Sequence, residues 1–157
     1  MAGQHVTRKV DEIILHNTYM PDIAGYKGPQ TVYAIARFNI ESQNWSNVGW
    51  HYMISPDGVI WTGRPLESNW SGVGGHYSGQ AVAVTLVVNG NTELPTEKQQ
   101  KALGVLLLAL CKKLSIVPSM NFAEGHGFHS DYNTLKKCPG DLISKQMVLK
   151  WMEEASH

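Results

Sequence analysis

Hydrophobic and polar positions follow two different periods along the chain, and the shorter period predicts strands. A continuous apolar run, EIILHN at residues 12–17, is typical of a buried strand that ends on a histidine. The run AVAVTLVV at 81–88 is rich in β-branched residues and is followed by NGN, which predicts a second buried strand. Residues 51–55 and 59–63 flank a Pro-Asp-Gly turn, and this arrangement predicts a hairpin.

Apolar residues at helical spacing predict three helices between and after these strands. The first covers residues 31–42, and the last begins at about Leu142. The longest covers residues 96–114, where Thr96 with Gln99 three positions later forms a capping box. Its core stripe consists of leucines: Leu103, Leu106, Leu107, Leu110 and Leu114. Because strands and helices interleave, we expect residues 1–157 to form one α/β domain with a mixed central sheet flanked by helices.

Composition excludes several classes of partner. The chain has 157 residues, and its 13 Lys and Arg balance its 13 Asp and Glu, so no basic field points to nucleic acid or to an anionic membrane. The first residues lack the apolar core of a secretion signal, and no uncharged apolar run reaches the ~18 residues of a membrane span. We therefore expect a monomeric protein made in the cytoplasm. Cys111 falls in an apolar helical run and Cys138 in a polar loop, so a disulfide between them is not suggested.

One polar segment, GFHSDYNTLKKCPG at residues 127–140, combines residue types that bind metals. His129 and Cys138 lie nine positions apart, and imidazole and thiolate are the ligands that zinc prefers. A catalytic zinc takes three protein ligands and leaves the fourth position open. His16, which ends a predicted buried strand, is the best-placed candidate for the third ligand.

Four motifs in order along the chain carry a resemblance to a known family: IILHNT, VGWHYMISPDGVIWTGRP, GVGGH before AVAVTLVVNGN, and FHSDYNTLKKCPG. The sequence resembles the zinc-dependent N-acetylmuramoyl-L-alanine amidases of the phage-lysozyme type, a superfamily that also holds the peptidoglycan recognition proteins. The resemblance implies an amidase-like fold, zinc ligands at His16, His129 and Cys138, and a catalytic lysine at Lys136. His126 competes with His129, but the His-x-Asp register and the distance to Cys-Pro-Gly favour His129.

The resemblance also implies the reaction, which is zinc-assisted hydrolysis of the amide between N-acetylmuramic acid and L-alanine in peptidoglycan. Lys136 would stabilise the oxyanion, and His51 and His76 would polarise water or bind substrate, although His51 can also be read as a surface histidine whose hydrogen bonds are satisfied. Aromatic faces for a sugar or peptide are expected at Trp50, Trp70 and Tyr77.

The chain departs from the family pattern at two positions. Trp50 stands where phage members often carry a catalytic tyrosine, and Thr85 stands where other members carry a glutamate. We place Thr85 among the substrate-binding residues as part of the strand, not as a catalyst. The identity of the proton donor is therefore open, whereas the metal assignment is not affected.

The biological role implied is that of a phage endolysin without a separate wall-binding domain, held in the cytoplasm until the inner membrane is breached. One alternative is a recognition module that binds peptidoglycan without cutting it, but such members tend to lose the metal-binding cysteine, and this chain keeps Cys138 and Lys136. A second is a bacterial muropeptide-recycling amidase. A third is a structural zinc site on an unrelated scaffold, which would need a fourth protein ligand.

Overall fold

The computed structural model describes residues 6, 8–43, 47–69, 80–132 and 137–157. Its centre is a four-stranded sheet in the order β1-β4-β2-β3, formed by β1 (Glu12–Asn17), β4 (Ala81–Leu86), β2 (Tyr52–Ile54) and β3 (Ile60–Thr62). β4 runs parallel to both β1 and β2, whereas β2 and β3 pair antiparallel as a hairpin. The mixed α/β sheet predicted from the hydrophobic pattern is therefore confirmed.

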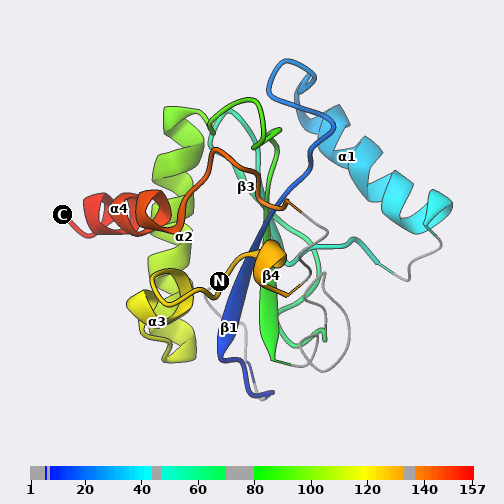
Figure 1. Ribbon diagram of the computed structural model, residues 1–157. Helices are drawn as coiled ribbons and strands as arrows, with labels where there is room; N and C mark the ends of the chain where they lie inside the picture. The colour runs from blue at the N-terminus through cyan, green and yellow to red at the C-terminus, as the bar shows by residue number, and fades with distance from the viewer. Residues whose placement is uncertain (1–5, 7, 44–46, 70–79, 133–136) are drawn as a thin grey trace.

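Helices cover both faces of this sheet (Figure 1). On one side lie α2 (Glu97–Leu114), α3 (Pro118–Phe122) and α4 (Lys145–Ala155), and on the other lies α1 (Pro29–Arg37), which continues into a π-helical turn, Phe38–Ser42. The capping box predicted at the start of α2 is present, with the Thr96 hydroxyl accepting from the Gln99 N–H at 3.0 Å. None of the described helices is long and apolar enough to cross a membrane.

Two details of the helices differ from the prediction. The last helix begins at Lys145 and not near Leu142, because the Ser144 hydroxyl accepts the Met147 N–H and caps the helix there. The five-residue helix α3, which begins at Pro118, was not predicted, because a single turn is too short to show helical periodicity.

Alternation along the strands divides the interior into two cores. Ile13 and Leu15 point to the face covered by α2 and α4, where the larger core lies, and Ile14 and His16 point to the opposite face. On that opposite face a smaller core gathers under α1: Val32, Val48, Trp50, Met53 and Val87. Residues paired in register share a face, so His16, Thr85 and Met53 form a row across three neighbouring strands on the side of α1.

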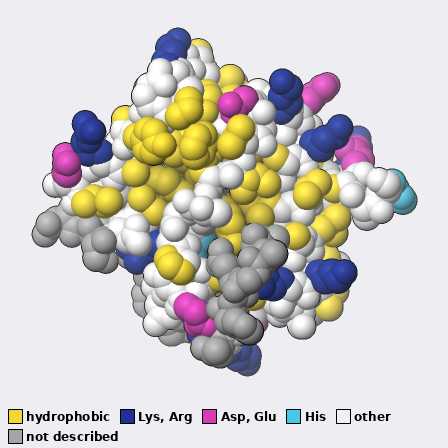
Figure 2. Space-filling view, turned by 180° about the vertical axis from the view of Figure 1, so that it is seen from behind, with side chains coloured by type: hydrophobic (Ala, Val, Ile, Leu, Met, Phe, Trp, Pro, Cys, Tyr) yellow, Lys and Arg dark blue, Asp and Glu magenta, His cyan; other side chains and the backbone are white. Residues whose placement is uncertain are grey.

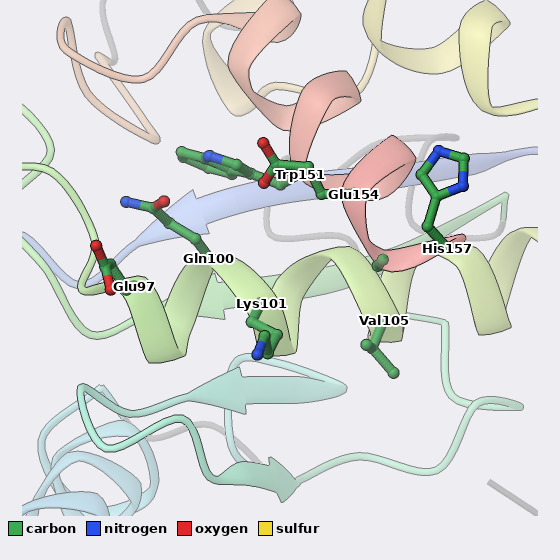
Figure 3. A pocket seen from close by; sticks show the side chains of 8 residues that line it. Glu97, Gln100, Lys101, Val105, Trp151, Glu154 and His157 are labelled. Carbon is green, nitrogen blue, oxygen red and sulfur yellow. The ribbon is translucent and has the colours of Figure 1, made fainter.

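The outer surfaces of the two layers have different character. On the α2 side, Gln100 and Lys101 of α2 line a surface cavity with Trp151 and Glu154 of α4 (Figure 3). Gly104 of α2 allows the two helices to pack closely, because a Cβ atom there would overlap the Trp151 carbonyl. On the α1 side, a groove between the β1–α1 loop and α1 is mainly apolar; its lining includes Met20, Pro21, Ala34, Ile35 and Phe38. Figure 2 shows the hydrophobic side chains that gather on the face turned away from the viewer of Figure 1.

Candidate metal centre

Three side chains from distant parts of the chain meet at the end of β1. His16 is the next-to-last residue of this strand and is 8% exposed, His129 opens a short 3-10 turn, and Cys138 lies in the loop before α4. Their ligand atoms all lie within 4.8 Å of one another, and Cys138 Sγ is 3.9 Å from His16 Nδ1. This is the set expected from the sequence. His126 is not part of it; its ring lies beside Tyr132, with the ring centroids 6.5 Å apart.

Main-chain contacts with β1 place His129. The Leu15 N–H donates to the Gly127 carbonyl at 2.6 Å, and Leu15 forms an isolated bridge with Phe128. One oxygen of Asp131 accepts the Phe128 N–H at 2.9 Å, while the other pairs with Lys145 at 2.7 Å. Gly127 is therefore hydrogen-bonded to β1 and Phe128 to Asp131, and these bonds fix the backbone from which the His129 imidazole projects.

Contacts with the loop after β4 place Cys138. The Leu142 N–H donates to the Gly90 carbonyl at 2.9 Å, and the Asp141 N–H donates to Asn91 Oδ1 at 3.0 Å. A Cβ atom on Gly90 would overlap the carbonyl group of Pro139, the residue after the cysteine. Only glycine at this position allows the Cys-Pro-Gly segment to approach the loop after β4 so closely.

Gly90→Ala should therefore displace the Cys-Pro-Gly segment. We expect a stability loss of about 1–3 kcal/mol from the added methyl group, together with weaker zinc binding because the sulfur moves with its loop. Urea unfolding and zinc titration measure the two effects. Gly25→Ala is the matched control, since its Cβ would meet only side-chain atoms at 3.1 Å or more and a main-chain nitrogen at 3.6 Å. Equal losses in the two variants would contradict this role of Gly90.

His51, a predicted catalytic residue, is fully buried and bonded at both ring nitrogens. The Ala83 N–H donates to Nδ1 at 2.9 Å, so the proton is on Nε2, which donates to the Ser68 carbonyl at 2.9 Å. Burial lowers the pKa of His51 to about 4. The alternative of a surface histidine is wrong in its location, because His51 is buried, but both ring nitrogens are hydrogen-bonded and tie β4 to the segment after β3, which favours a structural role.

Stability should consequently fall in mild acid. The pKa of His51 is lower in the folded protein than in the unfolded chain, so the unfolded chain binds more protons between pH 6.5 and about 4. The contribution of neutral His51 to the free energy of unfolding is complete above pH 6.5, and about 3 kcal/mol of it is lost as the pH falls to 4. This loss can be measured by thermal unfolding of the wild type and of His51→Gln across this pH range, with a chelator present. Parallel pH profiles of the two proteins would show that His51 does not carry this dependence.

The other predicted residues fall into three groups. Thr85 pairs in register with His16 and is 9% exposed, so it lies beside the metal centre. Trp50 is 4% exposed and packs in the smaller core, which favours a packing role for its indole; its place in catalysis stays a prediction. The remaining four lie outside the described residues, and their roles also stay predictions: Lys136, Trp70, His76 and Tyr77.

Asn17 and Gly90, which both touch the cysteine segment, were not predicted from the sequence. Asn17 donates its main-chain N–H to Cys138 Sγ at 3.0 Å. Its position directly after the predicted ligand His16 was a usable signal, because a residue next to a ligand often reaches the same site. Gly90 lies in the NGN turn, which indicated only that the strand ends there.

The fold is an α/β protein with a mixed sheet, and at the end of β1 two imidazoles and a thiol gather closely enough to hold a metal ion. The family described as N-acetylmuramoyl-L-alanine amidase matches residues 6–141, and the chain belongs to this family.

A curated relative and solved structures agree with this assignment. Peptidoglycan-recognition protein LB of Drosophila melanogaster is 27% identical over 143 residues, which are 89% of this chain and 59% of the relative. The structure of wild-type Drosophila PGRP-LB matches with a TM-score of 0.75 at 23% identity, over 92% of this chain and 82% of that one. The N-acetylmuramoyl-L-alanine amidase LysC of Clostridium intestinale matches with a TM-score of 0.73 at 24% identity, over 93% and 87%. The structural matches show a common fold.

Proposed function

We propose that the protein is a zinc-dependent amidase that hydrolyses the bond between N-acetylmuramic acid and L-alanine in peptidoglycan. The observation that carries the proposal is the cluster of His16, His129 and Cys138, whose ligand atoms lie within 4.8 Å of one another. Two imidazoles and one thiolate suit zinc, and the described residues add no fourth ligand to the group. Three ligands are typical of catalytic zinc, whereas structural zinc sites are closed by four.

Each part of the site then has a chemical task. A bound zinc ion would polarise the scissile carbonyl and make water a competent nucleophile near neutral pH. His16 and His129 hold the ion from two segments that the Leu15–Phe128 bridge joins, and Thr85 lies next to His16. Lys136 is the residue we expect to stabilise the negative charge on the carbonyl oxygen.

Comparisons with other proteins support the substrate class. The family description names this amide bond, and a variant of Drosophila PGRP-LB with a TM-score of 0.74 has been solved in complex with tracheal cytotoxin. We infer that this chain binds peptidoglycan or soluble muropeptides as a monomer. Its balanced charge favours neither nucleic acid nor a membrane surface as a partner.

Mass spectrometry of digested sacculi tests the proposal directly. The purified protein should hold about one zinc ion per chain and release stem peptides with a free N-terminal alanine. Activity should disappear after exhaustive chelation and return with zinc. Release of disaccharide fragments with the amide intact, or full activity in the chelated protein, would contradict it.

A non-catalytic recognition protein is the second candidate, favoured by the 27% identity to a peptidoglycan-recognition protein. Such a protein would bind sacculi in a pull-down without releasing peptides from them. Retention of Cys138, with its sulfur within 4.8 Å of the ligand atoms of both histidines, favours the enzyme, because binding alone does not require a complete zinc site.

We infer an endolysin role within the enzyme class. A fold match to the endolysin amidase LysCS of Clostridium intestinale, with a TM-score of 0.72 over 93% of this chain, supports it. The protein would then act on the wall after the inner membrane is breached. A turbidity assay on permeabilised bacteria can be compared with hydrolysis of soluble muropeptides. An endolysin should lyse the bacteria, whereas an enzyme that recycles wall fragments should prefer the soluble substrate.

A further inference from the structure

Asn17 contacts the sulfur of Cys138 through three groups, of which the main-chain carbonyl oxygen is the most distant at 3.6 Å from Sγ. Its main-chain N–H donates to Sγ at 3.0 Å, and its side-chain oxygen Oδ1 lies 3.1 Å from Sγ, where the thiol proton can be donated to it. Asn17 is the last residue of β1 and pairs in register with Leu86 of β4, so the sheet fixes its main chain. Cys138 is 121 positions away in sequence, and these contacts hold its sulfur beside His16.

The side-chain contact must change when a metal ion is bound. A thiol donates one hydrogen bond, but a metal-ligating sulfur has no proton and only accepts. An oxygen at 3.1 Å would then face the negative sulfur without a hydrogen between them. A carboxamide resolves this conflict, because a rotation of half a turn exchanges its oxygen for its NH₂ group within the same outline.

We propose that Asn17 is the positioning residue of the metal-ligating sulfur, and that its carboxamide donates a hydrogen bond to the sulfur when a metal ion is bound. The inference rests on the proposed zinc site. With its N–H and its carboxamide together, Asn17 would give the sulfur two hydrogen-bond donors in the metal-bound protein. Neither leucine nor aspartate can replace the second donor, since leucine has no polar group and an ionised aspartate only accepts.

Asn17→Leu removes the side-chain donor and leaves the main-chain donor in place. We expect zinc affinity to fall about 10-fold to 100-fold, the usual effect of losing a hydrogen bond to a ligand. In the cobalt-substituted protein, the sulfur-to-metal charge-transfer band should move to lower energy, because the sulfur electrons lose a stabilising donor. A purely structural role of Asn17 would not move this band.

The matched control is Gln100→Leu on α2. Gln100 is also a half-buried carboxamide, and it donates to the Pro95 carbonyl at 2.8 Å on the outer surface of α2, where it lines the cavity with Trp151 and Glu154 (Figure 3). The same change of residue type there should leave zinc affinity and the cobalt band unaltered. Asn17→Asp keeps the shape of the side chain, which guards against a folding defect, and it should weaken zinc binding as well.

The outcomes separate this inference from the proposed function. Wild-type zinc affinity and an unshifted cobalt band in Asn17→Leu, or wild-type zinc affinity in Asn17→Asp with the cobalt coordination unchanged, would overturn the role of Asn17. Either result would leave the zinc amidase intact. A wild-type protein that binds no zinc would instead remove the proposed function itself. A loss of affinity in both Asn17 variants, with the band shift in the leucine variant and an unaffected Gln100→Leu, would establish the positioning role.

Discussion

Cys138→Ala is expected to abolish both zinc binding and amide hydrolysis, and His16→Ala should do the same. The three ligand atoms form one compact group, so removal of any of them leaves only two ligands, too few to retain the ion at the concentrations of an assay. Elemental analysis of the purified variants, together with peptide release from sacculi, measures the two losses. Full activity in either variant would exclude the proposed centre.

Cys111→Ala is the control for this experiment. Cys111 is 3% exposed in the larger core, and burial raises the pKa of its thiol to about 11, so it stays protonated and unreactive. Its replacement should cost about 1–2 kcal/mol of stability through a small cavity, with zinc content and activity unchanged. A variant that lost zinc would show that the two cysteines do not have separate roles.

Lys136→Ala is expected to lower turnover by at least ~100-fold with zinc still bound, on the scale set by loss of one oxyanion donor. The expectation comes from the family resemblance, in which a lysine two positions before the cysteine stabilises the reacting carbonyl oxygen. The measurement is turnover against pH, with zinc content determined in each sample.

Lys137→Ala provides the comparison for Lys136. Its ammonium group is 3.5 Å from Asp141 in an exposed ion pair, which contributes little to stability. Turnover in this variant should stay near the wild-type value. If Lys136→Ala also retained wild-type turnover across the profile, the lysine would have no catalytic part, and His76 would be the next residue to test.

The strands and long helices were predictable because each carries its own local pattern. EIILHN and AVAVTLVV are short apolar runs, and Thr96 with Gln99 marks the start of α2; all three appear where expected. The order of strands in the sheet was not predictable. β4 lies between β1 and β2, and this order depends on long-range parallel pairing, which leaves no trace in local periodicity.

The cluster of His16, His129 and Cys138 was predictable because imidazole and thiol groups in polar segments have few purely structural uses. Their supports were not, since Gly127 and the N–H of Asn17 act through main-chain atoms that every residue type shares, and the close approach that requires Gly90 involves the distant Cys-Pro-Gly segment. The role of His51 could not be predicted for the same reason. Its type suggested catalysis, but its partners are the main-chain groups of Ala83 and Ser68, which no sequence pattern reveals.

The bridge between Leu15 and Phe128 also bears on how the protein avoids aggregation. β1 is an outer strand of the described sheet, and four of its six residues are buried. An uncovered apolar edge strand offers unpaired N–H and C=O groups to another chain. Here the segment that supplies His129 covers that edge, with the Leu15 N–H taken by Gly127 and Glu12 bonded to the Tyr132 hydroxyl. A zinc ion bound by His16 and His129 would add a further link between β1 and the segment that covers this edge.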